Sequence, residues 1–310
     1  MNTGTTRLPY GRAFVLGAKE KVMEVFHPKR ILCPIDFSEP ATLALHYGNE
    51  LAGCFDADLL VLYAEPLTPP PYFTARQIDK LKKEAELSKK KAHKSLKAYV
   101  RNRLGEAITA EIIVIGDQPV SSILKAAVER DVGLIVMGTH GHSGFNRFML
   151  GSVTERVLHE VDRPVLTVRL KKGEKDPQTI SVKRILCPVN MTEIAYRALE
   201  HAVSIAECFR ADLQVLHVIE RNIDEAEEKS EMDRLCQWIP QSIRSRCSLK
   251  EWVEKGDAAE RIIAVAATQG CDMIVIGAQH KRFVDTTVIG TTTTRVTRHA
   301  PCPVLTVIRK

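Results

Sequence analysis

The sequence lacks any apolar run long enough to cross a membrane. Its longest runs, such as Leu59 to Ala64 and Leu134 to Met137, are far shorter than the roughly 18 residues that a membrane-spanning helix requires. Residues 1–28 contain one brief apolar stretch, Ala13 to Leu16, closely followed by charges, which does not resemble a secretory signal. We therefore expect a soluble, cytoplasmic protein that has no membrane as a partner.

The sequence also lacks a metal-binding pattern. Its eight cysteines form no CxxC pair and no Cys/His spacing typical of zinc sites. Two pairs of cysteines recur at a fixed offset along the chain, Cys33 with Cys187 and Cys54 with Cys208. We interpret these four residues as small buried thiols, and we assign no metal ligand.

What the sequence does contain is a tandem repeat. Residues 138–168 align without a gap with residues 277–307, and Arg30 to Pro34 recurs as Arg184 to Pro188. The 310 residues fit two domains of about 140 residues each, which is the commonest domain size. The predicted organisation is an N-terminal extension, a first domain, a linker and a second domain, at residues 1–28, 29–170, 171–182 and 183–310.

Short apolar strands alternate with helical patterns in both copies. In the first copy the predicted strands are Ile31 to Ile35, Asp58 to Ala64, Ile112 to Ile115, Leu134 to Met137 and Val165 to Val168. The second copy repeats this order. Such alternation is typical of parallel sheets covered on both faces. It predicts an α/β fold made of two tandem doubly wound, mostly parallel five-stranded sheets.

Much of the excess positive charge lies in one segment, Lys80 to Arg103. Its apolar residues recur at near-helical spacing, which predicts an amphipathic helix with a solvated lysine face. No aromatic interleaving or recognised binding motif accompanies the lysines. We therefore expect no nucleic acid as a partner.

The candidate binding residues follow two predicted strands. Asp36 comes after the first strand and Gly138 after the fourth, so both would face the crevice where ligands bind in a doubly wound sheet. Gly138 and Gly141 would let backbone N–H groups approach an anion. Ser152 to Glu155 has the form of a capping box and predicts a helix start, a further anion site. Neither GxxxxGK[ST] nor GxGxxG occurs, so spacing alone leaves nucleotide binding and plain turns both open.

These residues resemble the universal stress protein family. Its nucleotide signature, Gly, two residues, Gly, nine residues, Gly-Ser/Thr, is matched from Gly138 to Ser152, and Pro34 to Ser38 and Gly116 to Pro119 also look like family motifs. The resemblance covers residues 30–169 and 184–309. It implies a Rossmann-like fold of the adenine-nucleotide alpha hydrolase type and ATP, with Mg²⁺, as the ligand of the first domain. The implied cofactor-binding residues are Pro34, Ile35, Asp36, Ala64, Gly116, Met137, Gly138, Thr139, Gly141, Gly151, Ser152, Val153 and Thr154.

The second copy departs from this pattern at two positions. Asn190 stands in the place of Asp36, and His280 replaces Gly141. A neutral amide has replaced a charged acceptor, and a side chain has entered the space where phosphate would approach the backbone. We therefore expect the second domain to bind no ATP in the usual way. It would act as a structural partner of the first domain or hold a site for a different ligand.

The resemblance implies a non-enzymatic, ATP-binding protein of stress response or signalling, with no catalytic residue. Two alternatives stay open, a nucleotide-free interaction scaffold and a slow ATP-hydrolysing enzyme. The HIGH-type and SGGxDS-type motifs of related enzymes are absent. Dimers of the family that the chain resembles often pair through the last strand, and two such apolar edges occur here, Pro164 to Arg169 and Pro303 to Ile308. We therefore expect the halves to pair as an internal pseudo-dimer. A further homodimer and an unidentified protein partner are also open.

Overall fold

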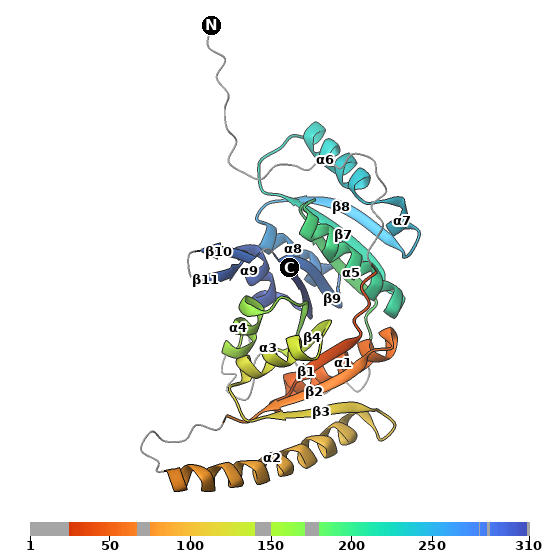
Figure 1. Ribbon diagram of the computed structural model, residues 1–310. Coiled ribbons are helices and arrows are strands. Elements are labelled where there is room, and N and C mark those ends of the chain that lie inside the picture. The colour runs from red at the N-terminus through yellow and green to blue at the C-terminus, as the bar shows by residue number, and fades with distance from the viewer. Residues whose placement is uncertain are drawn as a thin grey trace.

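The computed structural model describes residues 25–66, 75–139, 150–170, 180–278, 280–283 and 286–308. Ten strands form one continuous sheet in the order β3-β2-β1-β4-β5-β12-β9-β6-β7-β8 (Figure 1). The first half supplies β1 (Arg30–Pro34), α1 (Glu39–Phe55), β2 (Asp58–Ala64), α2 (Ala75–Leu104), β3 (Ala110–Ile115), α3 (Pro119–Glu129), β4 (Leu134–Gly138), α4 (Ser152–Glu160) and β5 (Val165–Val168).

The second half repeats this order and adds the short helix α7. Its hairpin of β10 and β11 corresponds in the repeat to a segment of the first half that lies almost wholly outside the described residues. The second half supplies β6 (Arg184–Val189), α5 (Glu193–Phe209), β7 (Asp212–Ile219), α6 (Glu225–Trp238), α7 (Gln241–Arg244), β8 (Leu249–Lys255), α8 (Ala258–Thr268), β9 (Met273–Ala278), β10 (His280–Phe283), β11 (Thr286–Ile289), α9 (Thr291–His299) and β12 (Val304–Ile308). The predicted α/β, mostly parallel fold is confirmed, and the two five-stranded sheets are joined into one.

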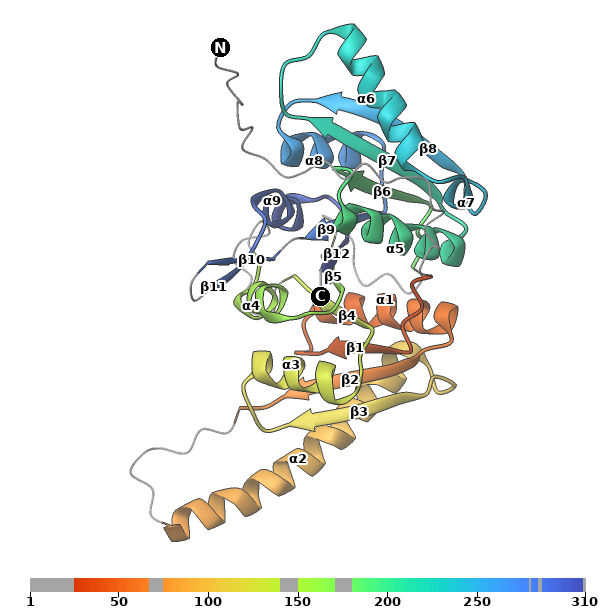
Figure 2. The ribbon, with the colours of Figure 1, turned by 45° about the horizontal axis from the view of Figure 1, so that its top comes forward.

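Helices cover both faces of the sheet, as a doubly wound fold requires (Figure 2). Helices α1, α2, α5 and α6 pack on one face, where a single hydrophobic core runs through both halves. Helices α3 and α4 cover the other face of the first half, and α8 and α9 cover that of the second. The central strands β1, β4, β5 and β12 are mostly apolar because both of their faces are buried. The edge strand β8 carries two lysines and two glutamates and is only partly buried.

The two halves meet where β5 pairs antiparallel with β12, the one antiparallel pairing of the ten-stranded sheet. Leu166 lies opposite Leu305, which is its own counterpart in the repeat, and Val165 lies opposite Thr306. A pairing of equivalent residues places a pseudo-two-fold axis between these strands. Arg169 adds a further link, because its guanidinium donates to the carbonyl oxygen of Thr297 at 2.7 Å.

A second contact between the halves lies on the face covered by α1 and α5. Cys54 of α1 and Cys208 of α5 form a disulfide with a Cα–Cα distance of 5.7 Å. The interpretation of these two residues as buried thiols is therefore wrong. Repeat-equivalent residues approach each other near the axis, and sequence periodicity alone does not reveal that. Cys33 and Cys187 are fully buried free thiols, and burial raises the pKa of each.

Helix α2 is the longest element, and its N-terminal part extends beyond the body of the first half (Figure 1, Figure 2). Leu96 and Val100 anchor its other end in the core. The lysines between them and the start of the helix are exposed wherever their side chains are described. None of the described helices is both long and apolar enough to cross a membrane.

Candidate functional site

The residues expected to bind a nucleotide follow the carboxyl ends of neighbouring parallel strands. Strand β1 lies between β2 and β4, so the chain order reverses between β1 and β4, where open α/β sheets bind ligands. Asp36 follows β1 and Gly138 ends β4, while Ala64 ends β2 and Gly116 follows β3. The topology therefore brings residues from four strands to one end of the sheet.

Asp36 orders the turn between β1 and α1. Its Oδ1 accepts hydrogen bonds from the backbone N–H of Ser38 at 3.0 Å and from the Ser38 hydroxyl at 2.6 Å, and Ser38 caps α1. Phe37 between them has a φ of 64°, which is uncommon for a non-glycine residue. Asn190 orders the equivalent turn, since its Oδ1 accepts from the hydroxyl of Thr192, the cap of α5, at 2.6 Å. The exchange of aspartate for asparagine keeps the turn and removes the charge.

Gly138 is required by packing, whatever ligand binds nearby. A Cβ at this position would lie 2.9 Å from the carbonyl carbon of Pro40 and 3.0 Å from the nitrogen of Ala41. Gly277 repeats this situation, with a Cβ only 2.8 Å from the carbonyl oxygen of Ile194. Because the second half keeps this close contact, the first glycine of the signature reports on helix–strand packing in both halves.

Helix α4 begins differently from the predicted capping box. Gly151 is the N-cap, its φ and ψ are −64° and 147°, and Ser152 is already the first helical residue. The capping box is therefore wrong, because a residue inside the helix cannot supply the cap. Gly151 has no side chain to pair with the first-turn N–H groups, which keeps them available to an anion.

Two hydrogen bonds hold the start of α4 against the end of β4. The Gly151 N–H donates to the carbonyl oxygen of Thr139 at 2.6 Å, and the Thr154 hydroxyl donates to that of Gly138 at 2.8 Å. Thr154 is buried, with 3% of its surface exposed, and its proton is committed to this bond. Ser152 is exposed, so its hydroxyl, together with the first-turn amides, is the donor that faces solvent.

Four other expected residues contribute through their backbone at most. The side chains of Ile35 and Met137 are buried in the hydrophobic core, and the Ile35 N–H is already paired with β2. Pro34 has no N–H group to donate. Val153 is half-buried and packs on the core beneath α4. These residues therefore support the end of the sheet by packing and offer few polar groups to a ligand.

An aromatic cluster beside Asp36 was not predicted from the sequence. The ring of Phe37 lies 5.1 Å, between centroids, from both Tyr63 and Tyr99, and the Tyr99 hydroxyl lies 2.5 Å from that of Thr42. Phe37 is 36% exposed. Phe37 and Tyr63 are sequence neighbours of the predicted site residues Asp36 and Ala64, so their place near the site could have been predicted. Tyr99 comes from the distant helix α2, and only the fold brings it here.

The second half carries a hairpin at the position that corresponds, in the sequence repeat, to the glycine signature of the first half. Strands β10 and β11 pair antiparallel, with His280 opposite Ile289. Gly141 lies outside the described residues, and of His280 only the backbone is described. The steric exclusion of phosphate by His280 therefore stays a prediction. A paired hairpin nevertheless uses its backbone groups within the protein, which leaves fewer of them for an anion.

The hairpin packs against the first half. Ile289 at the end of β11 and Ala278 at the end of β9 are buried in the same core cluster as Leu150 and the apolar face of α4. Next to this contact, Arg298 of α9 lies 2.5 Å from the carboxylate of Glu155 on α4. The second half thus contacts the helix whose start would face a phosphate.

The universal stress protein family model matches the chain over residues 27–169 and 181–307. A universal stress protein of Methanocaldococcus jannaschii is 30% identical over 146 residues, 47% of this chain and 85% of its own. One of Bacillus subtilis is 32% identical over 148 residues, 45% of this chain and 98% of its own. The crystal structure of a universal stress protein from Archaeoglobus fulgidus is 25% identical, with a TM-score of 0.65, and covers 91% of this chain and 99% of its own.

Proposed function

Because the chain belongs to the universal stress protein family, we propose that its first domain binds ATP and that its second domain is the structural partner of the first. The observation that carries this proposal is the uncapped start of α4, held by Thr139 and Gly138 at the point where the strand order reverses. Backbone N–H groups and the helix dipole at such a position favour phosphate.

Each side chain of the crevice has a role in this proposal. Asp36 accepts a hydrogen bond from a ribose hydroxyl or an adenine amino group. The partly exposed ring of Phe37 belongs to the next residue along the chain. The Ser152 hydroxyl and the first-turn amides of α4 donate to phosphate oxygens. Thr154 and Gly138 hold the helix and strand in place. Gly141 belongs to the same signature in the sequence.

Mg²⁺ fits this site as a companion of the phosphates. The described residues contain no cluster of three or more His, Cys, Asp or Glu side chains that would hold a metal ion. In nucleotide sites Mg²⁺ is commonly bound by phosphate oxygens, water and one or two carboxylates. We therefore assign it no set of protein ligands. Bound ATP would set the conformation or the choice of partner in a stress response or signalling role.

The proposal predicts about one ATP per chain. Titration calorimetry of the full chain with Mg-ATP measures this number directly. A stoichiometry near two would refute the asymmetry between the domains. Absence of heat, together with absence of nucleotide in freshly purified protein, would leave the interaction scaffold as the function. Accumulation of ADP or AMP during the titration would instead support the slow enzyme.

A matched pair of variants tests the position of the site. Gly151 has an extended backbone conformation that valine also adopts, so Gly151→Val places a side chain at the start of α4 without backbone strain. We expect it to abolish ATP binding while circular dichroism stays unchanged. Gly290→Val makes the same change at the start of α9, where a Cβ meets nothing within 4 Å. It should bind ATP as the wild type does.

A further inference from the structure

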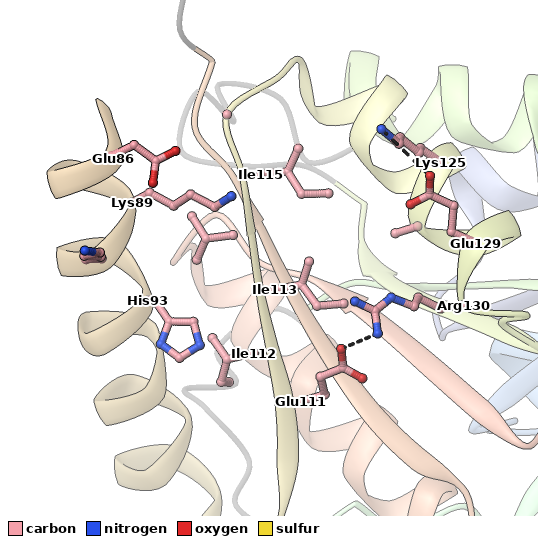
Figure 3. Close-up of a pocket in the computed structure, with 14 residues that line it drawn as sticks. Glu86, Lys89, His93, Glu111, Ile112, Ile113, Ile115, Lys125, Glu129 and Arg130 are labelled. Atoms are coloured by element: carbon pink, nitrogen blue, oxygen red, sulfur yellow. Dashed lines mark ion pairs between the residues drawn. The ribbon is translucent and has the colours of Figure 1, made fainter. Parts of the chain in front are cut away.

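A groove lies at the outer edge of the first domain, along β3, which β2 and β1 separate from β4 in the sheet. It shares Gly116 with the residues expected to bind a nucleotide. Its volume is about 680 Å³, and its walls are formed by α2 and α3 (Figure 3). Glu86, Lys89 and His93 reach toward it from α2. On the other side, Lys125 comes from α3 and Arg130 is the residue that caps the end of α3. Strand β3 forms the floor. A volume of this size accommodates a ligand of several residues or a drug-sized molecule.

The floor of the groove is the open edge of the sheet. Six consecutive residues, Glu111 to Gly116, line it. Successive side chains of a strand point to opposite faces of the sheet, so a groove that reaches all six must run along the edge itself. Within the described chain, β3 pairs with β2 on one side and with no strand on the other. A ligand in this groove would therefore meet backbone groups as well as side chains.

The register shows which backbone groups point outward. The carbonyl oxygen of Ile115 accepts from Glu65 beyond the end of β2, so Ile115 and Ile113 direct their backbone groups toward β2. The alternating residues Ile112 and Val114 direct theirs to the open edge. Such a row of outward donors and acceptors is a template for an added strand.

The charges of the groove favour an acidic partner. Two of its three carboxylates are already paired, Glu129 with Lys125 at 3.8 Å and Glu111 with Arg130 at 2.7 Å (Figure 3). Among the described residues, no carboxylate lies within 4.0 Å of Lys89 or Lys90. Helix α2 as a whole has eight lysines and three arginines against three acidic residues, whereas the chain has a net charge of +6. The excess positive charge is therefore concentrated on the helix that supplies one wall of this groove, with Lys89 and Lys90 in the wall itself.

The corresponding edge of the second half differs in charge. Strand β8 ends the sheet there, and the equivalent helix α6 carries five acidic residues against two basic ones. The two edges are related by the repeat, but only the edge at β3 has a basic wall. The edge strands differ as well, because β3 is mostly apolar whereas β8 carries two lysines and two glutamates.

We propose that the outer edge of β3 is a docking site for an extended, acidic peptide segment of another protein. The segment adds to the sheet through the backbone groups of Ile112 and Val114, and its carboxylates lie against Lys89 and Lys90. A nucleic acid fits less well, because the groove is lined with isoleucine and valine and has no Phe, Tyr or Trp on which bases would stack.

The test uses a fluorescein-labelled decapeptide of alternating valine and glutamate, titrated with the full chain and followed by fluorescence anisotropy. We expect saturable binding in the absence of ATP that weakens with added salt. A peptide with proline at alternate valines lacks the backbone donors, and one with lysine for glutamate has the wrong charge. Both should bind at least about tenfold more weakly. Equal binding of the proline peptide would overturn strand addition.

Variants of the protein separate the groove from its surroundings. Lys89→Glu with Lys90→Glu should weaken binding by about tenfold or more. Lys91→Glu with Lys94→Glu makes the same charge change on the same helix but outside the groove, and should have a much smaller effect. Ile112→Pro removes one outward N–H and no bond to β2, so it should weaken binding while the fold persists.

Three outcomes would overturn the proposal. If the two double lysine variants lost equal amounts of peptide affinity, the effect of Lys89 and Lys90 would be one of long-range charge and not of contact in the groove. Tighter binding of a 20-nucleotide oligothymidine, lost in the Lys89 and Lys90 variant, would assign the groove to nucleic acid. A dimer or larger assembly in light scattering that Ile112→Pro dissolves, with no effect of added peptide, would show that a second copy of the chain occupies the edge.

Discussion

Replacing Gly138 by alanine tests whether the first glycine of the signature serves packing or ligand binding. The new Cβ would lie 2.9 Å from two atoms of Pro40, about 0.5 Å closer than ordinary contact between carbon atoms. The atoms it meets belong to the first turn of α1, so backbone has to move. Overpacking of this kind costs about 1–3 kcal/mol.

The same change at two further glycines makes the test quantitative. Gly277→Ala brings a Cβ to 2.8 Å from the Ile194 carbonyl oxygen, and Gly290→Ala meets nothing within 4 Å. We expect Gly138→Ala and Gly277→Ala to lower the free energy of unfolding by similar amounts. Gly290→Ala should change it by at most about 1 kcal/mol, since it alters an N-cap that had no side chain.

Urea denaturation followed by two probes checks these values. Both tryptophans, Trp238 and Trp252, lie in the second domain, so their fluorescence follows that domain, while far-ultraviolet circular dichroism follows both. Gly138→Ala should shift the circular dichroism transition and Gly277→Ala the fluorescence transition to lower urea. An unchanged midpoint for Gly138→Ala, combined with lost ATP binding, would refute the packing argument and return this glycine to the ligand.

Three further predictions concern stability, and the first and last of them test contacts between the two halves. Cys54→Ser opens the bond to Cys208, whose sequence separation of 154 residues corresponds to at most about 5 kcal/mol of loop-closure entropy; a reducing agent should destabilise the wild type in urea but not this variant. Burial lowers the pKa of His201 to about 4, so the free energy of unfolding should fall by about 1.4 kcal/mol per pH unit as pH drops from the ordinary value of 6.5 towards 4. The His201→Gln variant should lose that part of the pH dependence, and an identical pH profile would contradict it. A double-mutant cycle on Glu155 and Arg298, both partly exposed, should give a coupling of about 0.5 kcal/mol in urea denaturation, and zero coupling would show that the ion pair does not join the halves.

The sequence was sufficient for the order of strands and helices because each element carries its own local pattern. It was not sufficient where a distant contact decides. Ser152 to Glu155 satisfies the capping-box pattern, yet Gly151 is the cap because its N–H is bonded to Thr139 across the turn. Strands β10 and β11 escaped prediction because part of their support comes from α4 in the other half.

The candidate site was open to prediction only in part, for the same reason. The glycine spacing and the position of Asp36 are readable from one stretch of sequence each. The burial of the Thr154 hydroxyl against Gly138 depends on how α4 meets β4. The aromatic cluster needs Tyr99, which α2 delivers from far along the chain. Side chains that meet only through tertiary packing have no fixed separation in the sequence, so no sequence motif reveals their contact.

The pairing of Leu166 with Leu305 means that the two sides of one interface are equivalent positions of the repeat, each encoded separately in the same chain. In a homodimer, a substitution near the axis appears in both subunits at once. A change that is favourable in only one subunit therefore cannot occur by itself. In this chain each side is free to change alone. Because both halves belong to one chain, each partner is always present, whatever the protein concentration. The two halves do differ at the candidate site, because Asn190 and His280 stand where the first half has Asp36 and Gly141.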